Sequence, residues 1–526
     1  MSSRPTRAAS CTCKAGCRSA VSKSRRCTSP NCCTKGSLRR TDGHVAPRRT
    51  ELPDYDIGKL AQSLRAICGP AGVIADPTDL LTYECDAYIV ERVTPDLVVM
   101  PATTDEAAQV MALLHREGVP VTPRGTGTSL AGGCLAASGG VVVTTTRLKR
   151  IREIDLRNRY AVLDAGVINA DLHRAVNPHG YHYAPDPSSE QSCTIGGTVA
   201  TNAGGPHTLK WGVTTNHVLG LEVVLPEGTV LNVGGPTPNL SGYDLTGVLV
   251  GSEGTLGLVT GVTVRLVRLA DAVRTMLAIF DRLEDATDTV TDIIGTGIVP
   301  AALELMDQTM LGAVESGLKV GFPTDAEAVL IIELDGLEPG LDEELEAVTG
   351  VCERHGVREV QRANTEAERA ALWKGRKRSF GCIGKLSRSF VCEDGVVPRP
   401  KLSQAIREIG KLASQHKMRV AIISHAGDGS LHPILLYDER DRAQVETMKC
   451  CSEAIMRKCL ELGGTSSGEH GIGWEKAKYL PVQYSVDDLD SMRQIRGVFN
   501  PTGRCNPHKI LGSDVPLVES LRGEAA

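Results

Sequence analysis

Two patterns of secondary structure follow one another along this chain, and they constrain its fold more than any other feature. Between residues 96 and 269, short β-branched runs such as 139–145 and 160–167 are separated by glycine- and proline-containing turns, with few helices. Beyond residue 270, helical spacing alternates with longer apolar runs. The first pattern predicts many short strands, and the second predicts an antiparallel sheet covered by helices on one face. We therefore expect an α+β protein.

The length of 526 residues is too great for one ordinary core, so more than one domain is expected. The pattern changes place the expected boundaries. They predict an N-terminal helical segment over 51–93, a first large domain over 94–270, a second over 271–513 that ends in a short helical segment, and a tail over 514–526.

A few elements can be placed more closely. Residues 97–100 and 119–123 are apolar and predict strands, and Thr104 with Asp105 predicts the start of the helix between them. Residues 443–462 carry apolar side chains at helical spacing, and the glycine pair at 463 and 464 is expected to end that helix.

Residues 1–50 differ from the rest in charge and composition. They hold twelve basic residues and one acid, few apolar residues, and the six cysteines Cys11, Cys13, Cys17, Cys27, Cys32 and Cys33. The cysteine spacing matches no regular CxxC pair, so we expect a disordered basic tail rather than a metal knuckle. An organelle transit peptide stays open, because the segment is rich in Arg and Ser and poor in acids.

The charge of the remaining chain argues against nucleic-acid binding. Residues 51–526 carry sixteen more acidic than basic side chains, and aromatic residues make up only 3% of the sequence. The other eleven cysteines are scattered, as reduced thiols of an intracellular protein are, and no apolar run reaches transmembrane length. We expect a cytoplasmic protein, with peripheral attachment to a membrane left open.

Three segments of the first domain are rich in glycine and other small residues: 121–133, 185–205 and 251–260. Glycine lets backbone N–H groups approach a phosphate closely, and neighbouring Ser and Thr hydroxyls add donors. The first segment has the spacing GxGxxxxGG with no acid about twenty residues later, so it is not a Rossmann dinucleotide fingerprint. Such segments suit a pyrophosphate or a planar ligand.

In this order, PRGTGTSLAGG, TIGGTVATNAGG and GSEGTLG resemble the PCMH-type FAD-binding domain shared by vanillyl-alcohol oxidase and UDP-N-acetylenolpyruvoylglucosamine reductase, which has two subdomains. The resemblance covers about residues 94–270 and implies FAD as cofactor. The residues that it implies for FAD binding are Pro123, Arg124, Gly125, Thr126, Gly127, Thr128, Ser129, Pro185, Asp186, Thr194, Gly196, Gly197, Asn202, Gly204, Glu253, Gly254, Gly257 and Val259. A covalent flavin link through Cys193 or His207 stays open.

Two glycine-rich segments of the second domain carry metal-binding residue types. SHAGDGSLHP contains His425 and His432, and SGEHGIG contains Glu469 and His470. Apolar runs on both sides of the first segment predict paired strands with a tight loop, so the two histidines could face one another. Two imidazoles and one carboxylate suit Zn, Mn or Fe(II) with positions left open, and the second-loop histidine could accept a proton.

These motifs, with LWKGRK at 372–377, resemble the C-terminal domain of the FAD-linked D-2-hydroxyacid dehydrogenases and the glycolate oxidase flavin subunit. The resemblance implies that His425, His432 and Glu469 bind a metal, that His470 is the catalytic base and that Arg376 binds the substrate carboxylate. Residues 306–310 and 393–400 look closest to the glycolate oxidase subunit. Ser430 stands where the family usually has a substrate-contacting Asn, which leaves the choice of substrate open.

The expected function is FAD-dependent, metal-assisted oxidation of a D-2-hydroxy acid, with glycolate or D-lactate preferred, to the 2-oxo acid. No iron–sulfur or nicotinamide motif is present, so an external acceptor is expected: iron–sulfur and second flavin subunits, a quinone or a cytochrome. Two alternatives remain, an FAD-dependent sugar or lactone oxidase and a flavin-binding subunit without its own catalysis.

Overall fold

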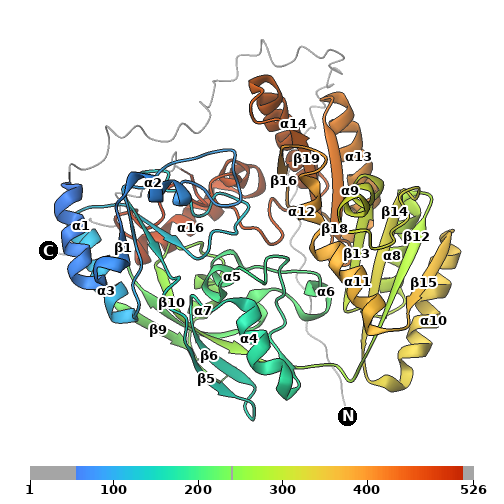
Figure 1. Cartoon of the computed structure of the whole chain (residues 1–526), viewed down its shortest axis with the longest axis horizontal. Helices are drawn as coiled ribbons and strands as arrows, with labels where there is room; N and C mark the ends of the chain where they lie inside the picture. The colour runs from blue at the N-terminus through green and yellow to red at the C-terminus, as the bar shows by residue number, and fades with distance from the viewer. Residues whose placement is uncertain (1–54, 238–240, 513–526) are drawn as a thin grey trace, which may run out of the picture. The chain divides into compact units, whose positions relative to one another are not determined.

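The computed structural model describes residues 55–237 and 241–512, and Figure 1 traces their helices and strands along the chain. The tails expected at residues 1–50 and 514–526 lie outside the described residues. None of the eleven cysteines in the described ranges forms a disulfide. Among the residues described, no helix combines the length and apolar character needed to cross a bilayer.

The first sheet has four strands in the order β1-β2-β4-β3, of which β2 and β3 both run parallel to β4. Its elements are α1 (Ile57–Cys68), β1 (Val73–Ile74), β2 (Leu97–Val99), α3 (Thr104–Arg116), β3 (Val121–Arg124) and β4 (Val141–Thr144). The predicted strand–helix–strand unit is confirmed, and α3 begins where expected because the Thr103 side chain caps it by accepting from the Glu106 N–H at 3.1 Å.

The second sheet has five antiparallel strands in the order β5-β6-β10-β8-β9. Its strands are β5 (Ile151–Asp155), β6 (Tyr160–Asp164), β8 (Val218–Val224), β9 (Val230–Gly234) and β10 (Leu258–Arg265). Three helices, α4 (Asn169–Val176), α5 (Ile195–Thr201) and α7 (Leu245–Leu249), contribute buried side chains to its core. This is the arrangement of short strands and few helices that the first pattern predicted.

The third sheet is antiparallel along the order β15-β12-β14-β13-β18-β19-β16, with β17 also paired to β19. Its strands are β12 (Ala272–Phe280), β13 (Ala302–Asp307), β14 (Ala328–Gly336), β15 (Glu359–Ala363), β16 (Ser389–Cys392), β17 (Gly395–Val396), β18 (Arg419–His425) and β19 (Ser430–Tyr437). The predicted antiparallel sheet with helices is therefore confirmed.

The expectation that helices cover only one face of this sheet is wrong. Met276 and Phe280 point into one apolar cluster and the alternating Leu277 and Ile279 into another, so both faces are buried. Helices α8 (Leu283–Gly295), α10 (Glu338–Arg354), α13 (Leu402–Gln415) and α14 (Arg442–Glu461) contribute to the first cluster, and α9 (Gln308–Leu318) and α12 (Ser379–Ile383) to the second. Continuous apolar strands such as β14 need cover on both sides.

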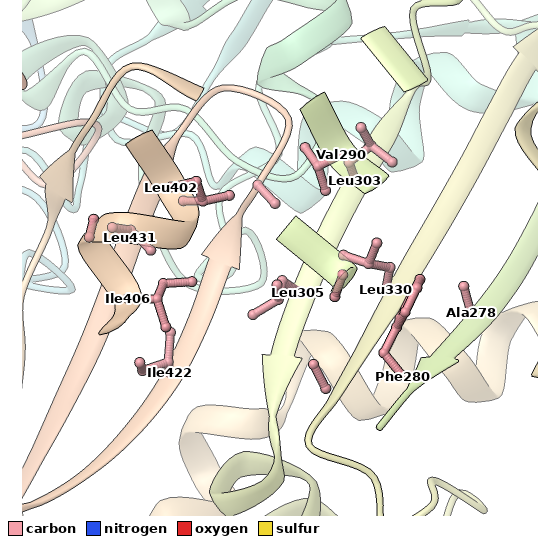
Figure 2. Packing of buried hydrophobic residues seen from close by; sticks show 14 of the residues in the cluster. Ala278, Phe280, Val290, Leu303, Leu305, Leu330, Leu402, Ile406, Ile422 and Leu431 are labelled. Atoms are coloured by element: carbon pink, nitrogen blue, oxygen red, sulfur yellow. The ribbon is translucent and has the colours of Figure 1, made fainter. Parts of the chain in front are cut away.

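Leu305 lies in the first of these clusters, fully buried between Ile406 and Leu330 (Figure 2). Replacing Leu305 by alanine is expected to destabilise this domain by about 2–5 kcal/mol. The strands and helices packed around Leu305 can relax only partly into the cavity that the smaller side chain leaves. A lower midpoint of thermal unfolding measures the loss. The matched change at Leu337, which is 71% exposed, should leave the midpoint unchanged, and equal effects at both positions would contradict the assignment of the core.

The chain returns to the first sheet at its C-terminal end. After α14 ends, with Gly463 at a φ of +86°, the helices α15 (Leu480–Gln483) and α16 (Val486–Phe499) form the predicted short helical segment. Beyond α16, the Val121 N–H donates to the carbonyl of Arg504 at 2.9 Å and the Asn506 N–H donates to the carbonyl of Val121 at 2.7 Å. The C-terminal segment thereby extends the edge of the first sheet at β3.

Candidate active site

One cavity of about 420 Å³ is lined both by the glycine-rich segments and by the histidine motifs. The residues predicted from the sequence that line it are Pro123, Arg124, Gly125, Thr126, Gly127, Thr128, Ser129, Thr194, Gly196, Gly197, Glu253, Gly254, Gly257, Val259, Arg376, His425, His432, Glu469 and His470. The fold thus brings together residues that are more than 300 positions apart in the sequence.

The glycine-rich segments fit a cofactor with phosphate groups. The loop after β3 passes so close to the start of α5 that a Cβ on Gly125 would lie 2.5 Å from the Thr194 hydroxyl oxygen. The Ser129 hydroxyl in this loop is buried and has no hydrogen-bond partner within residues 55–237 and 241–512. A narrow backbone cradle with an unused buried donor is suited to a phosphate oxygen.

Four residues predicted to bind the cofactor do not line this cavity: Pro185, Asp186, Asn202 and Gly204. The Asp186 carboxylate instead pairs with His207 Nδ1 at 2.9 Å and Lys377 Nζ at 3.3 Å. Asn202 ends α5 with a φ of +52°, and its side-chain oxygen accepts from the Thr215 N–H at 2.9 Å. Gly204 lies beside the histidine motifs, since its Cβ would be 3.1 Å from Glu469 Oε2.

The two residues for which a covalent flavin link was left open occupy different places. Cys193 lines the cavity, whereas His207 does not. The His207 ring stacks on Trp373 at 5.6 Å and pairs with two carboxylates, Asp186 and Glu333. Burial lowers the pKa of His207, but the two carboxylates outweigh burial and raise it to about 10. His207 therefore joins the FAD-binding part to β14 as a cation.

Glu253 connects the flavin part of the cavity to the second histidine motif. Its carboxylate accepts hydrogen bonds from the Ile472 N–H at 2.6 Å and the Gly473 N–H at 2.7 Å. Burial raises the pKa of Glu253 to about 7, against the effect of these two N–H groups. Glu253, one of the residues that the resemblance implies for FAD binding, thus has its carboxylate engaged with the segment that follows Glu469 and His470.

The two predicted metal-binding histidines lie within adjacent strands rather than in the turn between them. His425 at the end of β18 pairs with Ser430, and His432 of β19 pairs with Ile423, so the histidines are diagonal neighbours on one face. Their ring centroids are 5.1 Å apart in an edge-to-face arrangement. The turn of residues 426–429 is closed by Gly429 at a φ of +89°.

Glu469 completes this group from the second loop. Its Oε1 is 3.0 Å from His425 Nε2 and 3.3 Å from His432 Nε2, and the three ligand atoms lie within 4.8 Å of one another. Its Oε2 is buried without a partner in the described part of the chain. Two imidazoles and a carboxylate with one unused oxygen fit a divalent metal such as Zn, Mn or Fe(II).

Arg376, near the end of α11 (Glu366–Lys377), is only 1% exposed and faces the same cavity. One nitrogen of its guanidinium pairs with Glu304 at 2.6 Å, and Glu304 also lies 2.7 Å from His425 Nδ1. The Nε and Nη1 groups of Arg376 are buried and have no hydrogen-bond partner among the residues that the structure describes. Two unused donors on a fixed guanidinium suit a carboxylate ligand.

His470, the predicted base, lies beside the predicted metal ligands. Its ring stacks on that of His432 with centroids 5.0 Å apart and an interplanar angle of 14°. Burial lowers the pKa of His470 to about 4, although Asp394 acts in the opposite direction. An uncharged imidazole next to an arginine and a metal-binding group is able to accept a proton.

Sequence reasoning did not identify Glu304 or the apolar residues of the site. Glu304 is an acid flanked by apolar residues in the middle of strand β13. The available signal was therefore a charge at a position expected to be buried. Phe380, Phe390 and Ile423 line the cavity, and the two phenyl rings are 6.3 Å apart. No sequence motif marks these three residues, because they come from α12, β16 and β18.

Two family matches cover most of the described chain. Residues 95–234 match the family described as FAD binding domain, and residues 269–510 match the family described as FAD linked oxidases, C-terminal domain. A solved structure of p-cresol methylhydroxylase superposes with a TM-score of 0.73 at 14% identity, covering 88% of this chain and 98% of that chain. The fold predicted from the FAD-domain resemblance is thereby confirmed.

Sequence relatives cover most of this chain. It is 39% identical to the glycolate oxidase subunit GlcD of Escherichia coli strain K12, over 87% of this chain and 92% of the relative. It is 38% identical to the Bacillus subtilis GlcD, over 86% and 97%. It is 35% identical to a D-lactate dehydrogenase of Archaeoglobus fulgidus, over 83% and 96%.

Proposed function

Because the chain belongs to the FAD-linked oxidase family and is an oxidoreductase of the glycolate oxidase and D-lactate dehydrogenase type, we propose that it oxidises a small 2-hydroxy monocarboxylic acid. The favoured substrates are glycolate and D-lactate, and the products are the 2-oxo acids. The observation that carries this proposal is the pair of unused, buried donors on Arg376, in the same cavity as the glycine-rich segments.

Arg376 would bind the substrate carboxylate through Nε and Nη1. Glu304 pairs with the remaining guanidinium nitrogen, Nη2, at 2.6 Å. The Arg376 side chain is therefore already oriented before the substrate binds. Both side chains are buried, and the low dielectric around them strengthens each charge-assisted hydrogen bond. The substrate hydroxyl would then lie toward His425, whose Nδ1 is 3.4 Å from Nη2 of Arg376.

His425, His432 and Glu469 would hold the divalent metal. When bound, the metal supplies Lewis-acid chemistry by lowering the pKa of the substrate hydroxyl. Glu304 fixes the orientation of the His425 ring through Nδ1, which leaves Nε2 directed toward Glu469. The ligand set is thus oriented by contacts that exist within the protein itself.

His470 would remove the proton of the substrate hydroxyl with Nε2. That nitrogen lies 3.9 Å from Glu469 Oε1, on the side of the metal-binding group. FAD, when held by the glycine-rich segments, would supply the redox chemistry, with flavin N5 as the acceptor of the hydride from C2 of the acid. Loss of the hydroxyl proton and the C2 hydride converts the alcohol to a ketone, or to an aldehyde with glycolate, which balances the reduction of one flavin.

The apolar wall of the cavity supports a small substituent on the substrate. Phe380, Phe390 and Ile423 offer no group that could pair with a second carboxylate. Lys377 also lines the cavity, but its ammonium group pairs with Asp186 at 3.3 Å and Glu190 at 3.1 Å. We therefore expect D-2-hydroxyglutarate and D-malate, which carry a second charge, to be poorer substrates than D-lactate.

The test is anaerobic mixing of the purified FAD-containing protein with glycolate, D-lactate, L-lactate and D-2-hydroxyglutarate while the flavin absorbance is recorded. Bleaching with glycolate or D-lactate is expected at saturation, and at least about tenfold slower bleaching with D-2-hydroxyglutarate, because an unpaired charge would be buried. The L-isomer is the control for stereochemistry. No bleaching by any acid, with FAD present, would contradict the proposal.

Electrons must leave the reduced flavin for an external acceptor. The relatives named GlcD are subunits by name, so partner subunits are a reasonable source of that acceptor. We propose an iron–sulfur subunit together with a second flavin subunit, or a quinone or cytochrome. Reoxidation of the substrate-reduced protein by a quinone analogue and by cytochrome c, compared with oxygen, distinguishes these acceptors.

A further inference from the structure

We propose that Asp394 is a positioning residue that holds the loop of residues 467–470 in place, and with it Glu469 and His470. The role assigned to these two side chains rests on the proposed function, but the placement of the loop by Asp394 does not. Asp394 lies between β16 and β17, has no exposed surface and is not among the site residues predicted from the sequence.

One oxygen of Asp394 receives most of the donors of this loop. Its Oδ2 accepts from the backbone N–H groups of Gly468 at 2.9 Å, Glu469 at 3.1 Å and His470 at 2.9 Å. The Ser467 hydroxyl donates to the same oxygen at 2.7 Å. Three successive backbone N–H groups around one anion form a concave nest, so the loop conformation is specified by a buried carboxylate.

The backbone of this loop also lies very close to the Asp394 carboxylate. A Cβ on Gly468 would lie 3.1 Å from Asp394 Oδ1 and 2.8 Å from a methyl carbon of Val396. The backbones of Val396 and Thr465 exchange two hydrogen bonds, at 3.2 and 3.1 Å, just before the loop begins. Only glycine at 468 permits this contact, which ties the loop to the strand that follows Asp394.

The two oxygens of Asp394 also lie near the histidines of the site. Asp394 Oδ1 lies 3.8 Å from His432 Nδ1, and Oδ2 lies 4.0 Å from His470 Nδ1. Neither Oδ1 nor His470 Nδ1 has a hydrogen-bond partner within the described part of the chain. Together with the Glu393 carbonyl, 3.3 Å from His432 Nδ1, the carboxylate favours the tautomers that leave each Nε2 free, as ligand or base.

Lys476 pairs with this buried carboxylate. Its ammonium group lies 3.3 Å from Asp394 Oδ2, and both side chains are fully buried. A buried carboxylate is tolerated where a cation and several N–H donors compensate it, as they do here. From the FAD side, Glu253 anchors residues 472 and 473 by their backbone N–H groups.

The first test is hydrogen–deuterium exchange of metal-free protein, which does not depend on any catalytic role. In Asp394→Asn and Asp394→Ala, the amides of residues 468–470 are expected to exchange about tenfold or more faster than in the wild type, because charge-assisted hydrogen bonds are lost. The matched control is Asp307→Asn, since Asp307 is likewise a carboxylate in the third sheet that caps a backbone N–H, that of Met310, at 2.9 Å.

The second test measures Mn²⁺ affinity by the loss of the free-ion electron paramagnetic resonance signal. Loss of a group that orients a ligand typically weakens metal binding about 10- to 100-fold. The limiting rate of flavin reduction should also fall at saturating Mn²⁺, because His470 loses its anchor. FAD content and the thermal unfolding midpoint should stay near those of Asp307→Asn.

Unchanged exchange at residues 468–470 in both Asp394 variants would overturn the inference. Global unfolding of both variants would overturn it as well, because the carboxylate would then serve the fold rather than the loop. A wild-type protein that binds no Mn²⁺ and is not reduced by any hydroxy acid would contradict the proposed function alone, since faster exchange in the variants would still support the placement of the loop.

Discussion

Replacing His470 by alanine is expected to slow flavin reduction by glycolate or D-lactate by about 10²–10⁴-fold, which is the usual contribution of a positioned general base. The buried imidazole has a pKa of about 4, lowered first by burial, and is therefore neutral and able to accept the hydroxyl proton. The rate is measured by anaerobic stopped-flow at saturating substrate, and His470→Gln is the size-matched second variant.

The expected loss of flavin-reduction rate is specific to proton transfer, so the His470 variant should still bind FAD. None of the glycine-rich segments hydrogen-bonds to the His470 side chain among the described residues, and FAD content of the variant should match that of the wild type. His416→Ala is the control, since His416 ends α13 and does not line the cavity. Reduction of His470→Ala at the wild-type rate, or loss of FAD from it, would contradict the assigned role.

Removal of the divalent metal is expected to abolish flavin reduction as fully as loss of the base. Lewis-acid activation is worth several kcal/mol, so a fall of about 10³-fold or more is expected after dialysis against a chelator. Glu469→Gln should produce the same loss through weaker metal binding, because it removes the anionic ligand between His425 and His432. The measurements are metal content by mass spectrometry and the limiting rate of flavin reduction.

Readdition of Zn²⁺, Mn²⁺ or anaerobic Fe²⁺ to the chelated protein identifies the metal that restores the rate. Glu475→Gln is the matched control on the same segment. Burial, with help from Glu393, raises the pKa of Glu475 well above its ordinary value. Glu475 is not part of the group of predicted metal ligands, so amide replacement there should not alter metal content. Full activity in the chelated wild type would contradict the metal's part in the reaction.

Much of the fold could be predicted because local sequence patterns specify it. Short strands, the helix after Thr104 and the long helix that stops at Gly463 follow from propensity, capping and glycine, which act within a few residues. The prediction that helices pack on only one face of the third sheet was wrong. Its strands are apolar on both faces, but a sequence does not state which helices, here α9 and α12, lie on the second face.

The candidate site divides in the same way. Glycine-rich segments, His425, His432, Glu469 and His470 could be predicted, since backbone flexibility and ligand chemistry are properties of short motifs. Glu304 and Asp394 could not, because an isolated acid acquires a role only from its neighbours. Glu304 meets His425 across 121 positions, and Asp394 meets the His470 N–H across 76.

By itself, therefore, the sequence determined the α+β architecture, the flavin segments and the residue types that can bind a metal and accept a proton. Only the tertiary structure decided how these residues are held and what surrounds them. It fixed the diagonal pairing of the histidines, the unused donors of Arg376, the apolar wall and the buried carboxylates behind the ligands. The physical reason is that burial and electrostatic partnership are set by which distant segments pack together, and local sequence does not encode that choice.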